Sequence, residues 1–559
     1  MMPEPPPRTD PRIDGPVVRR PAGPPPISGG TLLVLHDGRA ALSDPDRDRV
    51  LVVEVDPGRI AAEIALRPGD EPGRLAEDAA GRLHVALRGS GEILTVDLPH
   101  AAHPSRRTVC PMPRGLAYDP SSDQIHVACR GGELVSLPAA GGPARRTLHL
   151  DRDLRDVVVS GDRLLVTRFR QAEVLTVGAD GSIAGRARPA DQDQTEAKVA
   201  WRAVATPDGR LVVVHQRHSL GEVRPAFGGY GSPFSFCDGI VRTELSVFAG
   251  GALEPGPQVA SAVLPVDLAL DVDAGRAVRA TVVSAADQGS APSLRTIPAE
   301  QLAGRACMFE SPTDTPIPGP VAVAYTADHR LLVQARDPAQ LWVVQPGGGE
   351  ARAIPLGGQA AYDTGHAIFH GATGAGIACA SCHPEGGDDG HVWRFEGVGA
   401  RRTPALHAAA GSAPFHWSGD LADIQALVNE VLVLRMRGPA LDAAHADALE
   451  AWLAHVPAPR QAASPSPQLA RGRAVFEARG CADCHSGRTG SSGRSADVGT
   501  GGAFQTPALA GLADRLPLMH TGCARTVADR FDPACGGATH GDPVPAAELP
   551  DLVAYLESL

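Results

Sequence analysis

The sequence predicts a multidomain protein in which an all-β region is followed by two all-α domains. The chain has 559 residues, more than one ordinary core holds at about 100–200 residues per domain. Between residues 29 and 355 an apolar strand, a turn and a second apolar strand recur many times. After residue 355 the apolar residues follow helical spacing instead. These observations place the change of fold near residue 355.

Composition narrows the classes of function. Hydrophobic residues make up 43% of the chain, which is ample for burial and excludes wholesale disorder. Lys and Arg number 52 against 64 for Asp and Glu, and no basic block occurs, so we expect no nucleic-acid partner. No run of about 18 apolar residues exists, so we expect no membrane-spanning helix.

Residues 1–28 are rich in proline and charge, and we expect them to form a disordered arm. They also lack the apolar core of a secretory signal peptide.

Residues 29–355 predict a β-propeller. Repeats of about 40–50 residues built from short antiparallel strands are typical of that fold, and the length suits seven blades. An irregular β-sandwich is the alternative. The pattern resembles the strand–turn–strand blades of bacterial YVTN/NHL-type propellers. The repeated strand pairs begin near 35–56 and continue at 75–87, 116–128, 157–167, 203–215, 268–280 and 323–335.

Two inserts, 217–240 and 285–315, are long for propeller loops. Long loops of this kind often contact a partner or a neighbouring domain. We therefore expect the propeller to act as a recognition domain for a small-molecule or protein ligand.

Two C-x-x-C-H pentapeptides carry the chemistry: Cys379, Cys382 and His383, and then Cys481, Cys484 and His485. Two thiols at this spacing form thioethers to one haem, and the adjacent histidine becomes the proximal iron ligand. Zinc ribbons place their pairs about 15–20 residues apart, whereas these lie about 100 apart. A thioredoxin-like site would need a βαβ context, which is missing. The sequence therefore predicts two covalently bound c-type haems with their iron.

The two pentapeptides belong to an internal repeat. Upstream, 365–369 matches 472–476; downstream, 402–406 matches 505–509, and 413–416 matches 516–520 with His416 opposite His520. Each half closes on an amphipathic helix. The repeat predicts two tandem all-α cytochrome c-type domains, at 356–458 and 464–559.

These two domains resemble the di-haem cytochrome c peroxidase family, which includes the MauG-type enzymes. Trp417 falls on the tryptophan that lies between the two haems of that family, and Gln425 and Met436 keep the family's mutual spacing. The resemblance implies that Trp417 and Gln425 serve electron relay or peroxidase-like catalysis. Two departures weaken a peroxidase assignment. Arg435 stands where the family has a glutamate, and Cys523, Cys535 and His540 replace the region of the second-haem methionine.

The sixth iron ligand decides between electron transfer and reaction with a small molecule. Met436 lies 20 residues after His416, and His540 lies 20 residues after His520. We therefore expect Met436 to complete the first haem, opposite His383, and His540 to complete the second, opposite His485. His391, His416, His520 and Met519 remain open as candidate ligands.

Six further cysteines remain once the four haem cysteines are set aside. We predict a disulfide between Cys523 and Cys535. Cys237 and Cys307 lie in the two inserts and are candidates for a second disulfide, so their pairing stays open. Cys110 and Cys129 are expected to be buried thiols in adjacent strands.

Covalent haem attachment implies an oxidising compartment. We expect a periplasmic or cell-envelope protein, whose signal segment is absent from this sequence or whose start is misassigned. The predicted function is electron transfer between the two haems and a redox partner, a small cytochrome or a cupredoxin. The alternative is an enzyme, a di-haem peroxidase or MauG-like oxidase that reduces hydrogen peroxide or oxidises a substrate.

Overall fold

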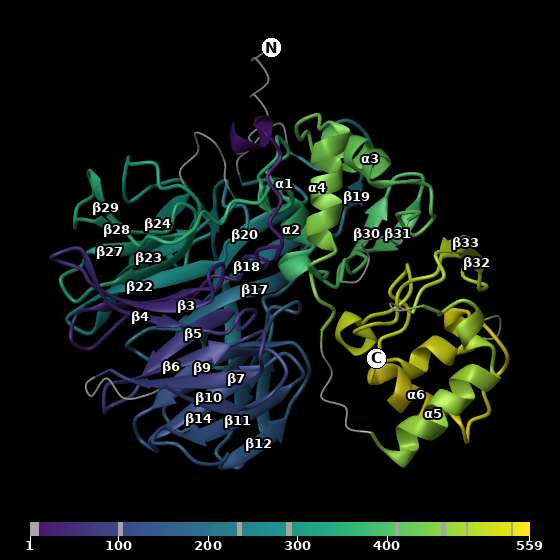
Figure 1. Cartoon of the computed structure of the whole chain (residues 1–559), viewed down its shortest axis with the longest axis horizontal. Helices are drawn as coiled ribbons and strands as arrows, with labels where there is room; N and C mark the ends of the chain where they lie inside the picture. The colour runs from purple at the N-terminus through teal and green to yellow at the C-terminus, as the bar shows by residue number, and fades with distance from the viewer. Residues whose placement is uncertain are drawn as a thin grey trace.

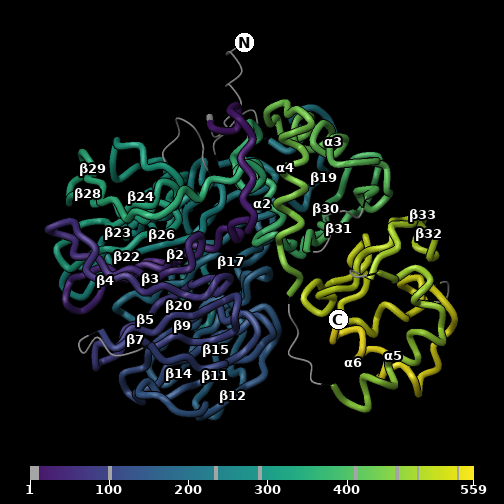
Figure 2. Tube along the Cα trace, in the orientation of Figure 1, coloured from purple at the N-terminus to yellow at the C-terminus, as the bar shows by residue number. Residues whose placement is uncertain are grey.

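The computed structural model describes residues 11–98, 104–231, 237–286, 293–407, 413–459, 465–487, 490–537 and 540–559. The first part of the chain is β-rich, and the helical segments lie along one side of it (Figure 1). The Cα trace shows the C-terminal segment as a separate body beside the first helical segment (Figure 2).

Small antiparallel sheets follow one another along the β-rich part, and most have four strands. Five sheets have four strands each: β1 Leu32–Val34, β2 Ala40–Asp44, β3 Arg49–Glu54 and β4 Arg59–Ala65; β5 Pro72–Glu77, β6 Arg82–Leu87, β7 Glu92–Asp97 and β8 Ser105–Thr108; β9 Pro113–Asp119, β10 Gln124–Cys129, β11 Glu133–Pro138 and β12 Arg146–His149; β13 Leu154–Ser160, β14 Arg163–Arg168, β15 Glu173–Val177 and β16 Ile183–Ala187; β26 Pro320–Tyr325, β27 Leu331–Ala335, β28 Gln340–Val344 and β29 Ala351–Pro355. A five-stranded sheet holds β17 Thr195–Ala205, β18 Leu211–Ser219, β20 Val241–Ala249, β21 Ala252–Val259 and β25 Cys307–Met308, and a three-stranded one holds β22 Asp267–Asp273, β23 Arg276–Val283 and β24 Leu294–Pro298.

The first strands of these sheets form a closed ring. β1, β5, β9, β13, β17, β22 and β26 lie side by side in that order, and β26 returns to β1. Apolar clusters fill the space between consecutive sheets; one of them joins Leu42 and Leu51 of the first sheet to Leu332 and Leu341 of the last. A closed ring of this kind is propeller-like, because no first strand is left as an open edge.

The two inserts pair with other parts of the chain. In the first insert, β19 (Glu222–Val223) pairs in parallel with β30 (Val392–Phe395), which also pairs with β31 (Gly399–Arg402). In the second insert, β25 pairs with β21, after the short helix η2 (Ala299–Gln301). The first insert therefore extends a sheet of the following helical segment.

The helical part contains two similar helix pairs. The helices are α1 Thr364–His370, α2 Cys379–Cys382, α3 Ile424–Leu427, α4 Ala443–Leu453, α5 Pro467–Ala478 and α6 Leu549–Glu557. The π-helix η4 is Val428–Arg435, and the 3-10 helices are η1 Pro11–Asp14, η3 Pro384–Gly386, η5 Cys481–Asp483, η6 Leu512–Arg515, η7 Ala528–Phe531 and η8 Pro533–Cys535. The hairpin β32 (Ser495–Asp497) and β33 (Ala503–Gln505) belongs to the second half.

Two glycines show why the helix pairs resemble each other. α1 packs on α4, and α5 packs on α6. A Cβ atom on Gly365 would come within 2.1 Å of the Ala448 carbonyl, and one on Gly472 within 2.0 Å of the Asp551 carbonyl. Each crossing therefore needs glycine, and the two glycines occupy the same position in the sequence repeat.

Residues 11–28 form an ordered strap, so the prediction of a disordered arm is wrong for them; residues 1–10 lie outside the described residues. The strap runs between the sheets and the first helix pair (Figure 1). The Val18 amide donates to Thr364 at 2.9 Å, and the Trp452 indole donates to the Pro24 carbonyl at 2.9 Å. Proline lacks an amide donor and has a fixed φ. A proline-rich extended segment therefore leaves few amide donors unpaired and loses little conformational entropy when it docks in this way.

Three disulfides join the cysteines outside the C-x-x-C-H motifs. Cys523–Cys535 forms as the sequence predicts, and Cys237 and Cys307, whose pairing the sequence leaves open, also form a disulfide. Cys110 and Cys129 also form a disulfide, so the prediction of buried thiols is wrong. Cys129 ends β10 opposite Pro113 in β9, which brings the preceding turn and Cys110 within a Cα–Cα distance of 6.3 Å.

Within the described residues, no helix is both long enough and apolar enough to cross a membrane.

Candidate haem centres

The first C-x-x-C-H loop spans α2 and the residue after it. The thiols of Cys379 and Cys382 are free, half-buried and available for thioether bonds. His383 Nδ1 faces the Gly387 carbonyl at 3.2 Å, and the Pro404 carbonyl also hydrogen-bonds to this imidazole. The Gly387 carbonyl favours a proton on Nδ1, and an imidazole protonated there offers Nε2 to a metal.

The second loop repeats this arrangement. Cys481 and Cys484 are free, and His485 Nδ1 faces the Gly490 carbonyl at 3.1 Å. The Pro507 carbonyl takes the place of the Pro404 carbonyl. Both histidines therefore have the backbone partners that orient a metal-bound imidazole.

His540 lies opposite His485, where the sequence predicts the sixth ligand of the second haem. The two ring centroids are 5.9 Å apart. Two imidazoles on opposite sides of one metal have centroids about 6 Å apart, given metal–nitrogen bonds of about 2 Å. Burial, with smaller contributions from Arg530 and His485, lowers the pKa of His540 to about 3. The imidazole is therefore neutral at pH 7, the form that binds a metal.

The residues around the second loop fit a covalent haem. An apolar cluster surrounds the loop and contains Phe476, Leu509, Leu518, Val527 and Leu552. Within the part of the chain that is described, no group of three His, Cys, Asp or Glu side chains suits a bare metal ion. The macrocycle of a haem supplies the remaining donors itself, so two axial histidines suffice.

Met436 lies against the first loop. It directly follows η4, is only 4% exposed, and belongs to the apolar cluster that also contains Ile377 and Ala378. The Ala375 amide donates to its carbonyl at 2.9 Å. Arg435, at the family's glutamate position, instead binds Glu430 at 2.8 Å and Tyr230 of the first insert at 3.2 Å. The first insert therefore helps to fix the segment that carries Met436.

His391 is held by the β-rich part. Its Nδ1 lies 2.6 Å from a Glu196 carboxylate oxygen, and its Nε2 lies 3.0 Å from the Ser219 carbonyl. Both ring nitrogens are thus engaged, and the ring stacks edge-on against Trp393. This arrangement leaves no nitrogen for iron, so we do not retain His391 as a ligand.

His416, His520 and Met519 lie at the border between the two helical halves. His416 is partly exposed and faces Asp420 at 3.3 Å. His520 stacks on Phe504 with centroids 3.9 Å apart. Met519 is half-buried beside the apolar cluster of the second half.

Trp417 and His520 are counterparts in the repeat, which corrects the pairing of His416 with His520. The isolated bridges Phe415–Leu421 and Leu518–Ala524 superpose the two turns, and His416 and Met519 share a positive φ of 67° and 70°. His416 therefore corresponds to Met519. The error arose because His416 follows Pro414 by two residues, whereas His520 follows Pro517 by three.

The two halves exchange equivalent hydrogen bonds across their border. The Gln505 amide donates to the Trp417 carbonyl at 2.8 Å, and the Arg402 amide donates to the His520 carbonyl at 2.6 Å. Arg402 and Gln505 hold the same position in the repeat. The Trp417 and His520 rings meet edge-on at 6.2 Å. The border is therefore self-complementary, as in a two-fold interface.

Gln425 lies on α3, where its side-chain amide donates to Asn429 and to the Leu441 carbonyl, both at 3.2 Å. These contacts tie α3 to the approach of α4, whereas the buried Oε1 of Gln425 has no hydrogen-bond partner among the described residues.

Sequence reasoning missed a buried charge cluster under the first loop. Glu385, two residues after His383, is 5% exposed, and its carboxylate lies 2.6 Å from Arg155, 2.8 Å from Arg114 and 2.9 Å from Arg88. A signal was present, because an arginine opens the first strand of three successive sheets, at Arg74, Arg114 and Arg155.

Residues 469–559 match the cytochrome c family model. No curated protein sequence matches the chain. A structure of Kuenenia stuttgartiensis hydrazine synthase is similar at 16% identity and a TM-score of 0.47, covering 60% of this chain and 98% of the other. A streptogramin B lyase structure is similar at 11% identity and a TM-score of 0.41, covering 56% and 92%. Another hydrazine synthase chain, from a crystal pressurised with xenon, shows 21% identity and a TM-score of 0.29, covering 33% and 81%.

The family match assigns a cytochrome c domain to the C-terminal segment. Such a domain carries a covalent c-type haem with its iron and serves haem-based electron transfer. The three disulfides, together with this domain, indicate an extracytoplasmic protein.

Proposed function

We propose that this protein is a di-haem c-type cytochrome that passes electrons between its two haems and an external redox partner. One observation carries the proposal: both C-x-x-C-H loops hold their histidine by the same backbone acceptors, with Nδ1 facing Gly387 in one and Gly490 in the other. The first loop thus has the geometry of the loop that lies within the matched cytochrome c segment.

The haem irons would be held by His383 and Met436 in the first half, and by His485 and His540 in the second. A haem supplies a one-electron iron couple. The protein side chains keep the imidazoles neutral and oriented and exclude water with the two apolar clusters. A thioether ligand favours the reduced iron more than an imidazole does, so we expect the first haem to have the higher potential.

Trp417 is proposed as the bridge between the two haems, since its ring lies where the two helical halves meet. The domains are proposed as 29–355, 356–458 and 464–559. Counting each sheet of the closed ring as one blade gives a seven-bladed propeller in the first of them.

The propeller has two proposed roles. It anchors the first haem loop through Glu385, and it recognises a ligand or partner with surfaces that this loop leaves free. The redox partner would be a small cytochrome or a cupredoxin, and the location the periplasm or cell envelope.

Spectra and haem content of the purified, haem-loaded chain test the proposal. We expect two covalent haems per chain by mass, wholly low-spin iron in the oxidised protein and no reaction with hydrogen peroxide. Cys379→Ser with Cys382→Ser should remove one haem, and Cys481→Ser with Cys484→Ser the other. One haem per chain would overturn the di-haem assignment. A high-spin haem that reacts with peroxide would favour a di-haem peroxidase or MauG-like oxidase instead.

A further inference from the structure

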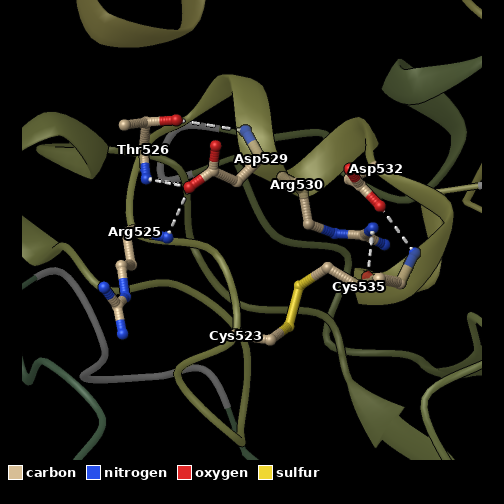
Figure 3. Close-up of a disulfide and its surroundings, with 8 residues drawn as sticks. Cys523, Arg525, Thr526, Asp529, Arg530, Asp532 and Cys535 are labelled. Atoms are coloured by element: carbon tan, nitrogen blue, oxygen red, sulfur yellow. Dashed lines mark hydrogen bonds between the residues drawn. A yellow bond between two sulfur atoms is a disulfide. The ribbon is translucent and has the colours of Figure 1, made fainter.

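Arg530 is a buried cation without an anionic partner among the described residues. It lies on η7, within the loop that the Cys523–Cys535 disulfide closes, and it is 6% exposed. Its Nη1 donates to the Cys535 carbonyl at 2.9 Å (Figure 3). Its Nε and Nη2 are buried and have no hydrogen-bond partner in the part of the chain that the structure describes.

Several other buried arginines in the described part of the chain are paired with carboxylates. Arg74 lies 2.9 Å from Asp156, Arg170 lies 2.8 Å from Asp388, and Arg217 lies 3.1 Å from Glu244. Arg530 has no such pair in the described part of the chain, and burial alone lowers its pKa to about 10. A buried charge without a partner is costly, so the site is built for an anion that the chain does not itself provide.

The position of Arg530 identifies that anion. Its guanidinium is held at the Cys535 carbonyl, and Cys535 belongs to the apolar cluster against which Cys481 of the second loop packs. Phe531 and Val527, its neighbours on the same turn, belong to the apolar cluster around the second haem loop. A haem bound at that loop brings two propionate carboxylates, which are its peripheral anionic groups.

We infer that Arg530 binds a propionate of the haem attached to Cys481 and Cys484. The Cys535 carbonyl holds Nη1, which fixes the guanidinium plane and leaves Nε and Nη2 as the two donors for a carboxylate. Bidentate recognition of a carboxylate is the geometry that arginine favours and lysine lacks. The disulfide, by closing the loop, holds this donor pair in place before the haem is bound. The inference rests on the second haem of the proposed function.

The test uses the full, haem-loaded chain and compares Arg530→Met with Arg525→Met. Arg525 lies in the same disulfide loop but is exposed, so its variant is the matched control (Figure 3). In Arg530→Met we expect the propionate bending mode of the resonance Raman spectrum to shift and the reduction potential of the second haem to fall. The potential falls because a nearby cation favours the reduced, less positive iron. Arg525→Met should leave both unchanged.

A third variant keeps the inference falsifiable if Arg530→Met fails to load haem. Arg530→Lys retains the charge but not the bidentate donor pair, so the potential should stay close to that of the unmodified protein while the propionate mode shifts. An unchanged propionate mode in Arg530→Lys or Arg530→Met, with the second haem present, overturns the inference. Loss of the second haem from the unmodified chain would instead overturn the proposed function, and haem content separates the two outcomes.

Discussion

The carboxylate of Glu385 lies 2.6 Å from the guanidinium of Arg155, and these residues are 230 positions apart in the sequence. Arg155 is the second residue of a first strand of the ring, and Glu385 follows His383 of the first C-x-x-C-H loop by two residues. Burial lowers the pKa of Arg155 to about 10, although the Glu385 charge raises it in part. This contact anchors the first haem loop to the inner strands of the propeller-like ring.

Glu385→Gln should strongly destabilise the haem-loaded chain. The change removes the charge that neutralises three arginines, and losing one partner of a buried ion pair costs about 3–5 kcal/mol. Denaturant unfolding followed by tryptophan fluorescence measures the effect. Glu396→Gln is the control, since Glu396 is exposed and pairs with exposed Arg224; it should cost at most about 1 kcal/mol. Equal losses in the two variants would contradict the anchoring role.

The pair of Glu196 and His391 predicts an acid-sensitive contact. Burial raises the pKa of Glu196, but the hydrogen bond with His391 and the charge of Lys198 outweigh it and lower the pKa to about 2, from an ordinary 4.5. The pair therefore stabilises the fold fully above pH 4.5, and this contribution is lost as the pH falls from 4.5 towards 2.

Thermal unfolding at a series of pH values checks this expectation. Glu196→Gln should be about 1–2 kcal/mol less stable than the unmodified chain at pH 6, after allowance for partial exposure. The difference should shrink steadily below pH 4.5. A difference that stays constant down to pH 2.5 would show that Glu196 acts through packing rather than charge.

Trp417→Phe should slow electron exchange between the two haems and leave both potentials nearly unchanged. The change removes the indole donor to the Arg402 carbonyl, a bond of 2.7 Å, and shortens the ring at the border between the halves. Flash reduction followed by absorbance measures the exchange rate. Trp342→Phe is the control, since Trp342 belongs to β28 and its indole binds Gln340. The bridge role is excluded if both variants exchange electrons at the rate of the unmodified protein.

Replacing Cys523 and Cys535 with alanine should lower the stability of the second haem domain by about 3 kcal/mol, because the disulfide closes a short loop. The Soret and charge-transfer bands of the second haem, recorded during unfolding, report the loss. Alanine at Cys110 and Cys129 is the matched control, since that disulfide joins β10 to the turn before β9 in the β-rich part. The prediction is wrong if the control shifts the second-haem transition as much.

Much of this organisation could be predicted from local pattern. The strand pair at 75–87 forms β5 and β6, and the pair at 116–128 forms β9 and β10. Alternating apolar residues and turn residues depend only on neighbouring positions, so their periodicity can be recognised in the sequence. The free cysteines of both C-x-x-C-H motifs were predictable for the same reason.

The buried charges could not be predicted in this way. Charged residues are usually expected on the solvated surface. Only the closing of the ring brings Arg114, Arg155 and Glu385 into one buried cluster. The strap was missed because its partners, such as Thr364 and Trp452, lie far along the chain. His416 was aligned with His520 because the residue types match, although the two histidines lie two and three residues after their prolines.

The strap cannot make all of its contacts until Trp452 has been synthesised. Pro24 leaves the ribosome early, yet the indole that binds it belongs to Trp452, 428 residues later. At about 5–20 residues per second, the first segment waits roughly 20 to 90 s for that partner. The ring of sheets is synthesised in the meantime, and the strap is closed over it by the helices of the first haem loop. A truncated product that stops before Trp452 would therefore keep the Val18–Thr364 contact of the strap but lack its anchor at Pro24.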